Sequence, residues 1–269
     1  MSGAAEARQP VGGAAIDLER VGMVFPSRRG PVRVLRDVSF SVRAAEFIAL
    51  LGPSGCGKST LLNVVAGLLR ATAGAVRIDG APVTRPYTRA GMVFQRPVLL
   101  DWRTALQNVL LAAEAHHLPR AAAQARASEL LTSVGLADFA HAYPRELSGG
   151  MQQRVAICRA LLHDPPLLLM DEPFAALDAL TRDQMAVDLQ RLWLAQQPTV
   201  LFVTHSIPEA VFLADRVIVL TSRPGQIDRV CEIDLGRPRT LRTRQTPAFA
   251  AYVQQLLDLF VATGLLVEQ

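Results

Sequence analysis

The chain has 269 residues, half of them hydrophobic, and a formal net charge of +4. No run approaches the roughly 18 consecutive apolar residues that a membrane helix needs, so we expect no transmembrane span. The 28 basic residues exceed the 24 acidic ones only slightly, so the charge alone indicates neither a nucleic-acid nor a membrane-surface partner. A chain of this length can form one large domain.

The N-terminus and the cysteines are typical of a reducing compartment. Met1–Ala15 is small and polar and lacks the apolar segment of a secretory signal, so we expect a flexible N-terminus on a cytoplasmic protein. Cys56, Cys158 and Cys231 are widely spaced. This spacing predicts neither a disulfide framework nor a zinc site.

Three segments with alternating apolar residues predict a small antiparallel sheet. They are Ile16–Phe25, Val38–Val42 and Val76–Gly80. Phe25 ends the first of them. Its ring could stack on a nucleotide base or serve as an ordinary core residue, and the sequence leaves both interpretations open.

A phosphate-binding loop with the pattern G-x-x-x-x-G-K-[ST] is the strongest motif. It follows a buried strand, Glu46–Leu51, and precedes a helix, Leu61–Ala66. Its residues are Gly52, Pro53, Ser54, Gly55, Cys56, Gly57, Lys58, Ser59 and Thr60. Glycines let the backbone N–H groups turn towards a phosphate, and the helix N-terminus favours an anion. Lys58 is the only lysine of the chain, which indicates a site that requires a compact ammonium rather than a guanidinium.

The next segment predicts a short strand and then a helical insertion. Ala90–Gln95 is apolar and ends in Gln95, whose amide could contact a metal ion or position a water molecule. From Leu99 to about Tyr143 alanine and leucine dominate, and helical spacing extends over Ala105–Ala113 and Ala121–Val134.

A serine and two glycines precede the next predicted helix, Val155–Leu162. Ser148 fits an N-cap, and Gly149 and Gly150 leave backbone N–H groups open. The segment is either a second anion site or a capped helix and nothing more.

Two carboxylates end a buried strand that spans Pro166–Pro173. At the edge of a parallel sheet, Asp171 could hold hydrated Mg²⁺, and Glu172 could orient or deprotonate a water molecule. Adjacent strand residues point in opposite directions, so we expect different roles for them. His205 ends another apolar strand, Thr199–Thr204, and could contact a γ-phosphate.

The C-terminal part predicts a hairpin and two helices. A helix over Leu180–Ala195 precedes the His205 strand, and Arg216–Leu220 pairs with Gln226–Val230 around a Pro-Gly turn. Arg237–Arg244 is basic, and we interpret it as a solvated linker, with phospholipid contact as the alternative. Phe249–Phe260 predicts a terminal helix.

Taken together, these motifs resemble the ATP-binding subunit of ABC transporters. The resemblance rests on the phosphate loop, on Gln95 in the place of the Q-loop, on Leu147–Gln153 as the signature, on Asp171 and Glu172, on Ala176–Asp178 as the D-loop and on His205 as the switch histidine. It implies an α/β fold, a P-loop NTPase of ABC type, with a mixed core sheet and flanking helices, an antiparallel β subdomain and an inserted α-helical subdomain. The ATPase domain would cover residues 16–235 with the helical subdomain at about 97–147, a linker and helix would fill 236–269, and residues 1–15 would be flexible.

The resemblance also implies the roles of single residues and the cofactors ATP and Mg²⁺. Two copies would enclose two ATP molecules, each between Lys58 and Ser59 of one copy and Ser148–Gly150 of the other. Phe25 would stack on adenine, Ser59, Gln95 and Asp171 would serve the metal, Glu172 the water and His205 the γ-phosphate. Asp178 would communicate across the dimer.

A protein of this kind works with separate membrane subunits. The resemblance implies a transmembrane permease, an extracellular or periplasmic solute-binding protein, no nucleic acid, and a peripheral location at the cytoplasmic face of the bacterial inner membrane. Leu99–Thr104 and Thr204–Ala210 are similar to the nitrate, sulfonate and taurine importers, although Asp101 stands where we expect proline. The alternatives are import of another small solute and a soluble ABC ATPase without a transport role.

Overall fold

The computed structural model describes residues 12–28 and 30–263. The flexibility predicted for residues 1–11 lies outside the described residues. That prediction extended too far along the chain, because Ala14 is buried and its N–H donates to the carbonyl of Pro166. Ala15 N donates to Asp79 Oδ1 in the same way.

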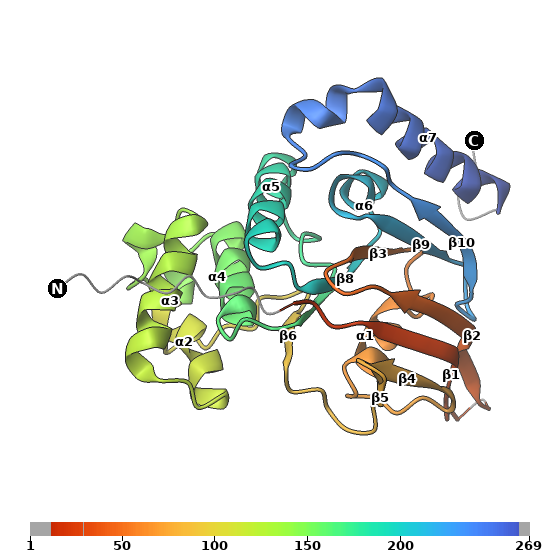
Figure 1. Cartoon of the computed structure of the whole chain (residues 1–269), viewed down its shortest axis with the longest axis horizontal. Helices are drawn as coiled ribbons and strands as arrows, with labels where there is room; N and C mark the ends of the chain where they lie inside the picture. Colours follow the sequence, from red (N-terminus) through yellow and green to blue (C-terminus); the bar gives the residue numbers. More distant parts are fainter. Residues whose placement is uncertain (1–11, 29, 264–269) are drawn as a thin grey trace.

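Most of the predicted strands and helices are present (Figure 1). In chain order they are β1 (Ile16–Phe25), β2 (Val32–Val42), β3 (Phe47–Leu51), α1 (Lys58–Val65), β4 (Ala73–Ile78), β5 (Ala81–Pro82), β6 (Ala90–Val93), α2 (Ala105–Ala115), α3 (Arg120–Ser133), α4 (Gly149–Leu161), β7 (Leu167–Asp171), α5 (Ala179–Gln196), β8 (Thr199–Thr204), α6 (Ile207–Leu213), β9 (Arg216–Leu220), β10 (Ile227–Glu232) and α7 (Pro247–Ala262). Strand β2 begins earlier than predicted, and β6 ends before Gln95. Helix α6 was not predicted, because seven residues are too few for a clear helical period.

Two sheets form the frame of the molecule. The larger one has the strand order β10-β9-β3-β8-β7-β6 and is parallel except for β10. The smaller one, β2-β1-β4-β5, is antiparallel, as predicted from its alternating segments. Strands β3 and β8 are buried along their whole length, which explains why their sequences are continuously apolar.

The larger sheet separates two hydrophobic clusters. Successive side chains of a strand point to opposite faces, so Phe47, Ala49 and Leu51 of β3 join one cluster, while Ile48 and Leu50 join the other. The first cluster continues into α2 to α7, and the second fills the space around α1 and the smaller sheet. Figure 1 shows α1 between the two sheets and α5 and α6 on the opposite face.

Helices α2, α3 and α4 form a lobe beside the sheets (Figure 1). A capping box between Thr104 and Gln107 begins α2. Buried Asn108 holds the preceding loop, because its side chain accepts from Leu100 N at 2.8 Å and donates to the carbonyl oxygen of Arg103 at 2.9 Å. The predicted helical insertion is therefore present, with its entry loop fixed.

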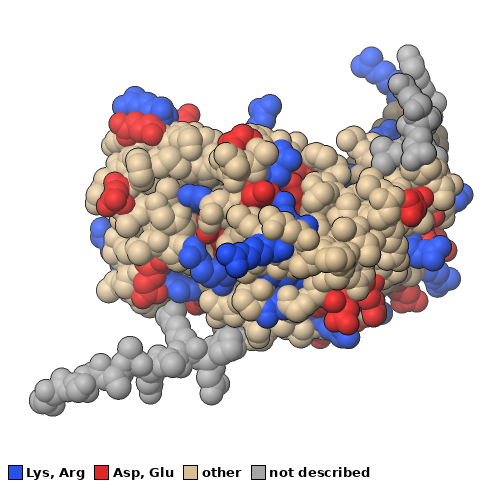
Figure 2. All heavy atoms as spheres, turned by 90° about the horizontal axis from the view of Figure 1, so that it is seen from above, with Lys and Arg blue, Asp and Glu red and all other residues tan. Residues whose placement is uncertain are grey.

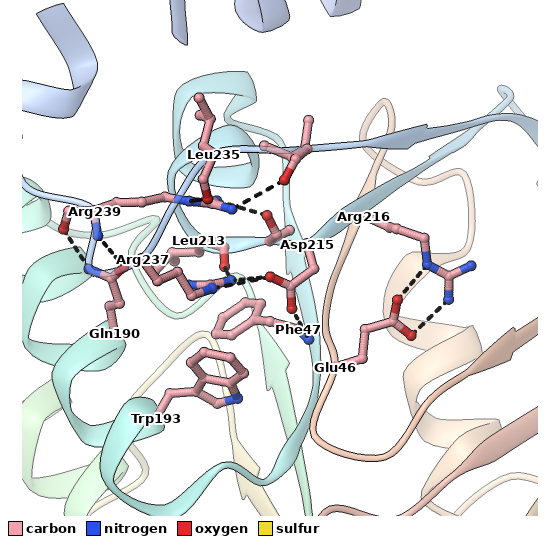
Figure 3. A network of polar contacts seen from close by, with 12 residues as sticks. Glu46, Phe47, Gln190, Trp193, Leu213, Asp215, Arg216, Leu235, Arg237 and Arg239 are labelled. Atoms are coloured by element: carbon pink, nitrogen blue, oxygen red, sulfur yellow. Dashed lines mark hydrogen bonds and ion pairs between the residues drawn. The ribbon is translucent and has the colours of Figure 1, made fainter. Parts of the chain in front are cut away.

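The interpretation of Arg237–Arg244 as a solvated linker is wrong for Arg237 and Arg239, although Arg242 is exposed. Arg239 is only 1% exposed and donates to five backbone carbonyls, among them those of Val211, Phe212 and Ala214 at the end of α6. Arg237 donates to Leu213 O at 2.5 Å and to Asp215 Oδ1 at 2.7 Å, and its guanidinium lies over the Trp193 ring (Figure 3). A helix leaves its last carbonyls without partners, and these two arginines supply the missing donors.

No helix within the described ranges has the length and apolar character needed to cross a bilayer. The face seen from the side of α7 carries basic side chains near its centre and acidic ones around them (Figure 2).

Candidate functional site

Three neighbouring parallel strands bring the predicted site residues together. Strands β3, β8 and β7 are adjacent, and their carboxyl ends lie level, with Leu51 opposite Thr204 and Val203 opposite Asp171. The phosphate loop follows β3, His205 follows β8 and Glu172 follows β7. Ligands collect at this edge of open α/β sheets, so the site lies where the topology favours one.

The phosphate loop has a backbone that only glycine adopts easily. Gly55 and Gly57 have φ of 76° and 107°, and Gly57 is the N-cap of α1. A Cβ atom at Gly57 would lie 2.7 Å from Leu35 Cδ2, so a larger residue has no room there. The loop thereby leads directly into the N-terminus of α1, which favours a phosphate.

Lys58 is held over the loop. Its side chain is 4% exposed, and Nζ donates to Gly52 O at 2.7 Å and to Pro53 O at 3.0 Å. The same nitrogen lies 3.9 Å from Glu172 Oε1. The Lys58 ammonium therefore lies between the phosphate loop and Glu172.

The two neighbouring carboxylates have different hydrogen-bond partners. Asp171 Oδ1 accepts a hydrogen bond from Ser59 Oγ at 2.8 Å. Burial raises the pKa of Asp171, and the Ser59 hydrogen bond acts against this rise. Glu172 lies just beyond β7 with φ of 43°, a backbone conformation that is costly for a residue with a side chain, and its Oε2 is 3.2 Å from His205 Nδ1.

The donors beside the phosphate loop fit Mg²⁺ bound together with phosphate. Across residues 12–28 and 30–263, no three His, Cys, Asp or Glu side chains form a metal site of their own. Ser59 and Asp171 instead offer two adjacent oxygen atoms. Mg²⁺ prefers oxygen ligands and usually takes one or two from the protein and the rest from phosphate and water.

The remaining predicted residues lie apart from this group. Gln95 is exposed beyond β6, and Phe25 ends β1 and packs partly against the second hydrophobic cluster. Ser148 caps α4 by accepting from Met151 N at 3.3 Å, and Asp178 caps α5 by accepting from Thr181 N at 3.0 Å. In the described part of the chain, no hydrogen bond or ion pair joins these four to Lys58, so their roles stay predictions.

The signature turn is presented to solvent on one side and packed on the other. Ser148 and Gly149 are exposed, and a Cβ atom at Gly149 would meet nothing within 4 Å. Gly150 is buried, and a Cβ atom there would lie 2.5 Å from Thr181 Cγ2. One glycine is needed for close packing against α5, and the other keeps a helix N-terminus accessible.

Sequence reasoning missed one contact to the phosphate loop. Arg223, in the turn between β9 and β10, donates to Gly55 O through Nε at 3.3 Å and Nη2 at 3.2 Å. Gly225 N of the same turn donates to Val34 O at 2.8 Å. The hairpin itself was predicted, but its return to the loop depends on the tertiary fold and leaves no local pattern.

The chain matches the family model described as ABC transporter over residues 35–175. It is 44% identical to the nitrate import ATP-binding protein of Synechococcus elongatus, with 88% of each chain covered. It is 46% identical to the taurine import ATP-binding protein of Rhizobium johnstonii, over 82% of this chain and 85% of the relative.

A solved structure has the same fold. The chain is similar to the ATP-binding cassette MJ0796, whose structure is described as a dimer in a post-hydrolysis state bound to ADP and Pi. The TM-score is 0.73 at 33% sequence identity, and the match covers 82% of this chain and all of the other. The predicted fold class is thus confirmed.

Proposed function

Because this chain belongs to the ABC transporter family, we propose that it is the ATP-hydrolysing subunit that powers import of a small anion through a separate membrane permease. One observation carries the proposal: Lys58, Ser59, Asp171, Glu172 and His205 meet at the carboxyl ends of three parallel strands. A loop for phosphate, a hydroxyl–carboxylate pair for a metal and a carboxylate–histidine pair for water are the parts that phosphoryl transfer requires.

Each side chain has a distinct task in the reaction. Lys58 neutralises charge on the β- and γ-phosphates, and the N–H groups before α1 hold the phosphate oxygens. Glu172 orients the attacking water and accepts its proton. His205 Nδ1, 3.2 Å from Glu172 Oε2, would help to keep that carboxylate in place, and the other ring nitrogen would contact the γ-phosphate. Ser59 and Asp171 would hold Mg²⁺, which would supply positive charge beside the phosphates.

A second copy of the chain would complete each nucleotide site. The Ser148–Gly150 turn offers an accessible helix N-terminus, which favours an anion but lies apart from the phosphate loop of its own chain. Leu180, beside Asp178 at the start of α5, is 84% exposed, which suits an interface. In a head-to-tail dimer, one copy's turn would seal the ATP of the other, Gln95 would approach the metal and Phe25 the adenine.

The helical lobe offers a site for the permease. A groove of about 920 Å³ lies between α2 and α3, and Trp102 at its edge is 73% exposed. Leu110 and Leu118 give it an apolar lining, while Arg103 and Glu114 place charges on it. A short cytoplasmic segment of a membrane protein fits such a groove. The subunit would therefore lie peripherally at the cytoplasmic face of the bacterial inner membrane.

The relatives' names support a small anion as the cargo. Nitrate is an oxyanion, and taurine carries a sulfonate group. A binding protein outside the membrane would select among such solutes. The 28 basic residues exceed the 24 acidic ones only slightly, so the proposal includes no nucleic acid.

The test uses Glu172→Gln, which keeps the shape of the side chain and removes its base. We expect ATP binding to persist, hydrolysis to fall by about 10²-fold or more, and dimers to accumulate with ATP and Mg²⁺ in size-exclusion chromatography. Arg242→Gln, an exposed residue outside the site, is the control and should match the wild type. A Glu172→Gln chain that turns over normally and stays monomeric would overturn the proposal. ATP-driven solute uptake into vesicles that contain the permease would distinguish a transport subunit from a soluble ATPase.

A further inference from the structure

Two charged residues that the proposed mechanism does not use lie between two of its turns. Arg182 is on α5, four residues after Asp178, and Glu209 is on α6, four residues after His205. Arg182 Nε lies 3.5 Å from Glu209 Oε1. The ion pair thus joins the helix that follows the D-loop to the helix that follows the switch histidine.

The Glu209 carboxylate contacts the side chain of Thr204, the residue before His205, and Thr204 in turn accepts a hydrogen bond from the backbone after His205. Glu209 is 5% exposed, and its Oε2 accepts from Thr204 Oγ1 at 2.6 Å. The same Thr204 oxygen accepts from Ser206 N at 3.0 Å. Burial raises the pKa of Glu209, and the Thr204 hydrogen bond and the charge of Arg182 act in the opposite direction. A buried carboxylate of this kind needs its cation, so the position of Arg182 and that of the His205 turn depend on each other.

Arg182 holds the D-loop from the other side. Its Nη2 donates to Leu177 O at 2.9 Å, and its backbone N–H donates to Asp178 O at 2.9 Å. Asp178 in turn caps α5 through Thr181 N. One guanidinium therefore donates to the D-loop backbone through Nη2 and forms an ion pair with the Glu209 carboxylate through Nε, without a hydrogen bond at Nε within the described residues. A single ammonium nitrogen cannot take both positions at once.

We propose that the Arg182–Glu209 ion pair is a positioning element that fixes the His205 turn and the Asp178 turn relative to each other. The inference rests on the proposed function: in the head-to-tail dimer, His205 faces the nucleotide of its own chain and Asp178 faces the other site. A shift of one turn on γ-phosphate binding or loss then moves the other turn. Because each chain contributes to both ATP sites of the dimer, the pair thereby couples those two sites.

The experiment compares Arg182→Gln, Glu209→Gln and the double variant with a matched control on the same helix. The control is Arg191→Gln, which breaks an ion pair with Asp188 that is 3.0 Å long. We measure kcat, KM and the Hill coefficient of ATP hydrolysis, and the affinity of the monomer for a fluorescent ATP analogue. Thermal unfolding is recorded for every variant.

The expected result separates positioning from folding. In the Arg182 and Glu209 variants kcat falls about tenfold or more and the Hill coefficient moves towards 1, while the affinity of the monomer for nucleotide changes less than about twofold. The double variant is no worse than the poorer single one, because both remove the same link. Arg182→Lys keeps a charge beside Glu209 but not the fork to Leu177, so it retains the stability of the wild type and not its cooperativity.

Two results would overturn the inference. Variants that lose thermal stability yet keep the wild-type kcat and Hill coefficient show that the pair only stabilises the fold. A loss of kcat and cooperativity in Arg191→Gln equal to that in Arg182→Gln shows that the effect is not specific to this link. If the wild-type chain itself does not hydrolyse ATP, the proposed function fails and the inference with it, whereas a cooperative wild type with unaffected variants rejects the inference alone.

Discussion

The two ends of α6 carry charged groups of opposite character. Before its first residue, Glu172 and His205 are 3.2 Å apart, and Glu172 lies 3.9 Å from Lys58, with both Glu172 and His205 partly open to solvent. After its last residue, Arg239 is buried and donates to five backbone carbonyls. Glu172 and His205 keep solvent access, while the buried Arg239 has its hydrogen-bond partners already in place.

The largest effect should follow a change at Lys58, which is buried and lies 3.9 Å from Glu172. Lys58→Arg keeps the charge, but its site is 4% exposed and filled by the carbonyls of Gly52 and Pro53, so a planar guanidinium has no room between them. We expect kcat/KM for ATP to fall by about 10³-fold, which is of the order found when a charge-stabilising donor is lost. Steady-state ATPase measurements check this. Thermal unfolding close to that of the wild type would show that the fold is retained.

A result within tenfold of the wild type would weaken the comparison. It would mean that the loop tolerates a larger cation and that the single lysine of the chain has no special role at this position.

The next largest effect should follow a change at Arg239, beside the C-terminal end of α6. Arg239→Ala removes the donor to the last carbonyls of α6 and leaves a cavity, so we expect the free energy of unfolding to fall by about 3 kcal/mol or more. Urea unfolding measures it. Arg242→Ala, in the same basic run but exposed, should stay within about 0.5 kcal/mol of the wild type. Equal effects at both positions would contradict the distinction between buried and solvated arginines in this segment.

The same contrast explains what the sequence could and could not predict. The positions of the phosphate loop, Glu172 and His205 at one sheet edge were predictable because each follows a clear apolar strand. Arg239 was misinterpreted because a run of arginines is usually solvated, and nothing near it in sequence reveals that α6 ends beside it. Arg182 and Glu209 gave no signal either, since they meet only when α5 and α6 pack. Local patterns therefore carry the chemistry, while buried polar contacts between distant segments are set by the tertiary fold.

A smaller effect concerns the pH dependence of stability. Burial raises the pKa of Glu46, but the hydrogen bonds from Arg216 (Figure 3) and from Arg43 together outweigh burial, so the pKa is lowered overall. The pKa of Asp171 is shifted in the opposite direction. Because the pKa is lower in the folded protein than the usual 4.5, this carboxylate stabilises the fold above pH 4.5, and the contribution is lost as the pH falls through the folded value.

Glu46→Gln should therefore reduce the free energy of unfolding by about 2 kcal/mol at pH 7 and by much less at pH 3. Urea unfolding across this pH range gives both values. Glu114→Gln is the control, because its pair with Arg103 is solvent-exposed and should give little change at either pH. A loss of unfolding free energy in Glu46→Gln that grows as the pH falls would contradict the prediction. It would mean that the hydrogen bonds from Arg216 and Arg43 do not stabilise the ionised carboxylate.

The smallest effect is expected at Arg223, an arginine that contacts the site but stays exposed. It donates to Gly55 O at 3.2 and 3.3 Å, and water can replace it there at little cost, unlike at the carbonyls around Arg239. Arg223→Ala should raise KM for ATP about two- to fivefold and leave kcat unchanged, because the loop becomes slightly less fixed before phosphate binds. A loss of kcat comparable to that of Lys58→Arg would show instead that Arg223 touches the reacting phosphate and does not merely support the loop.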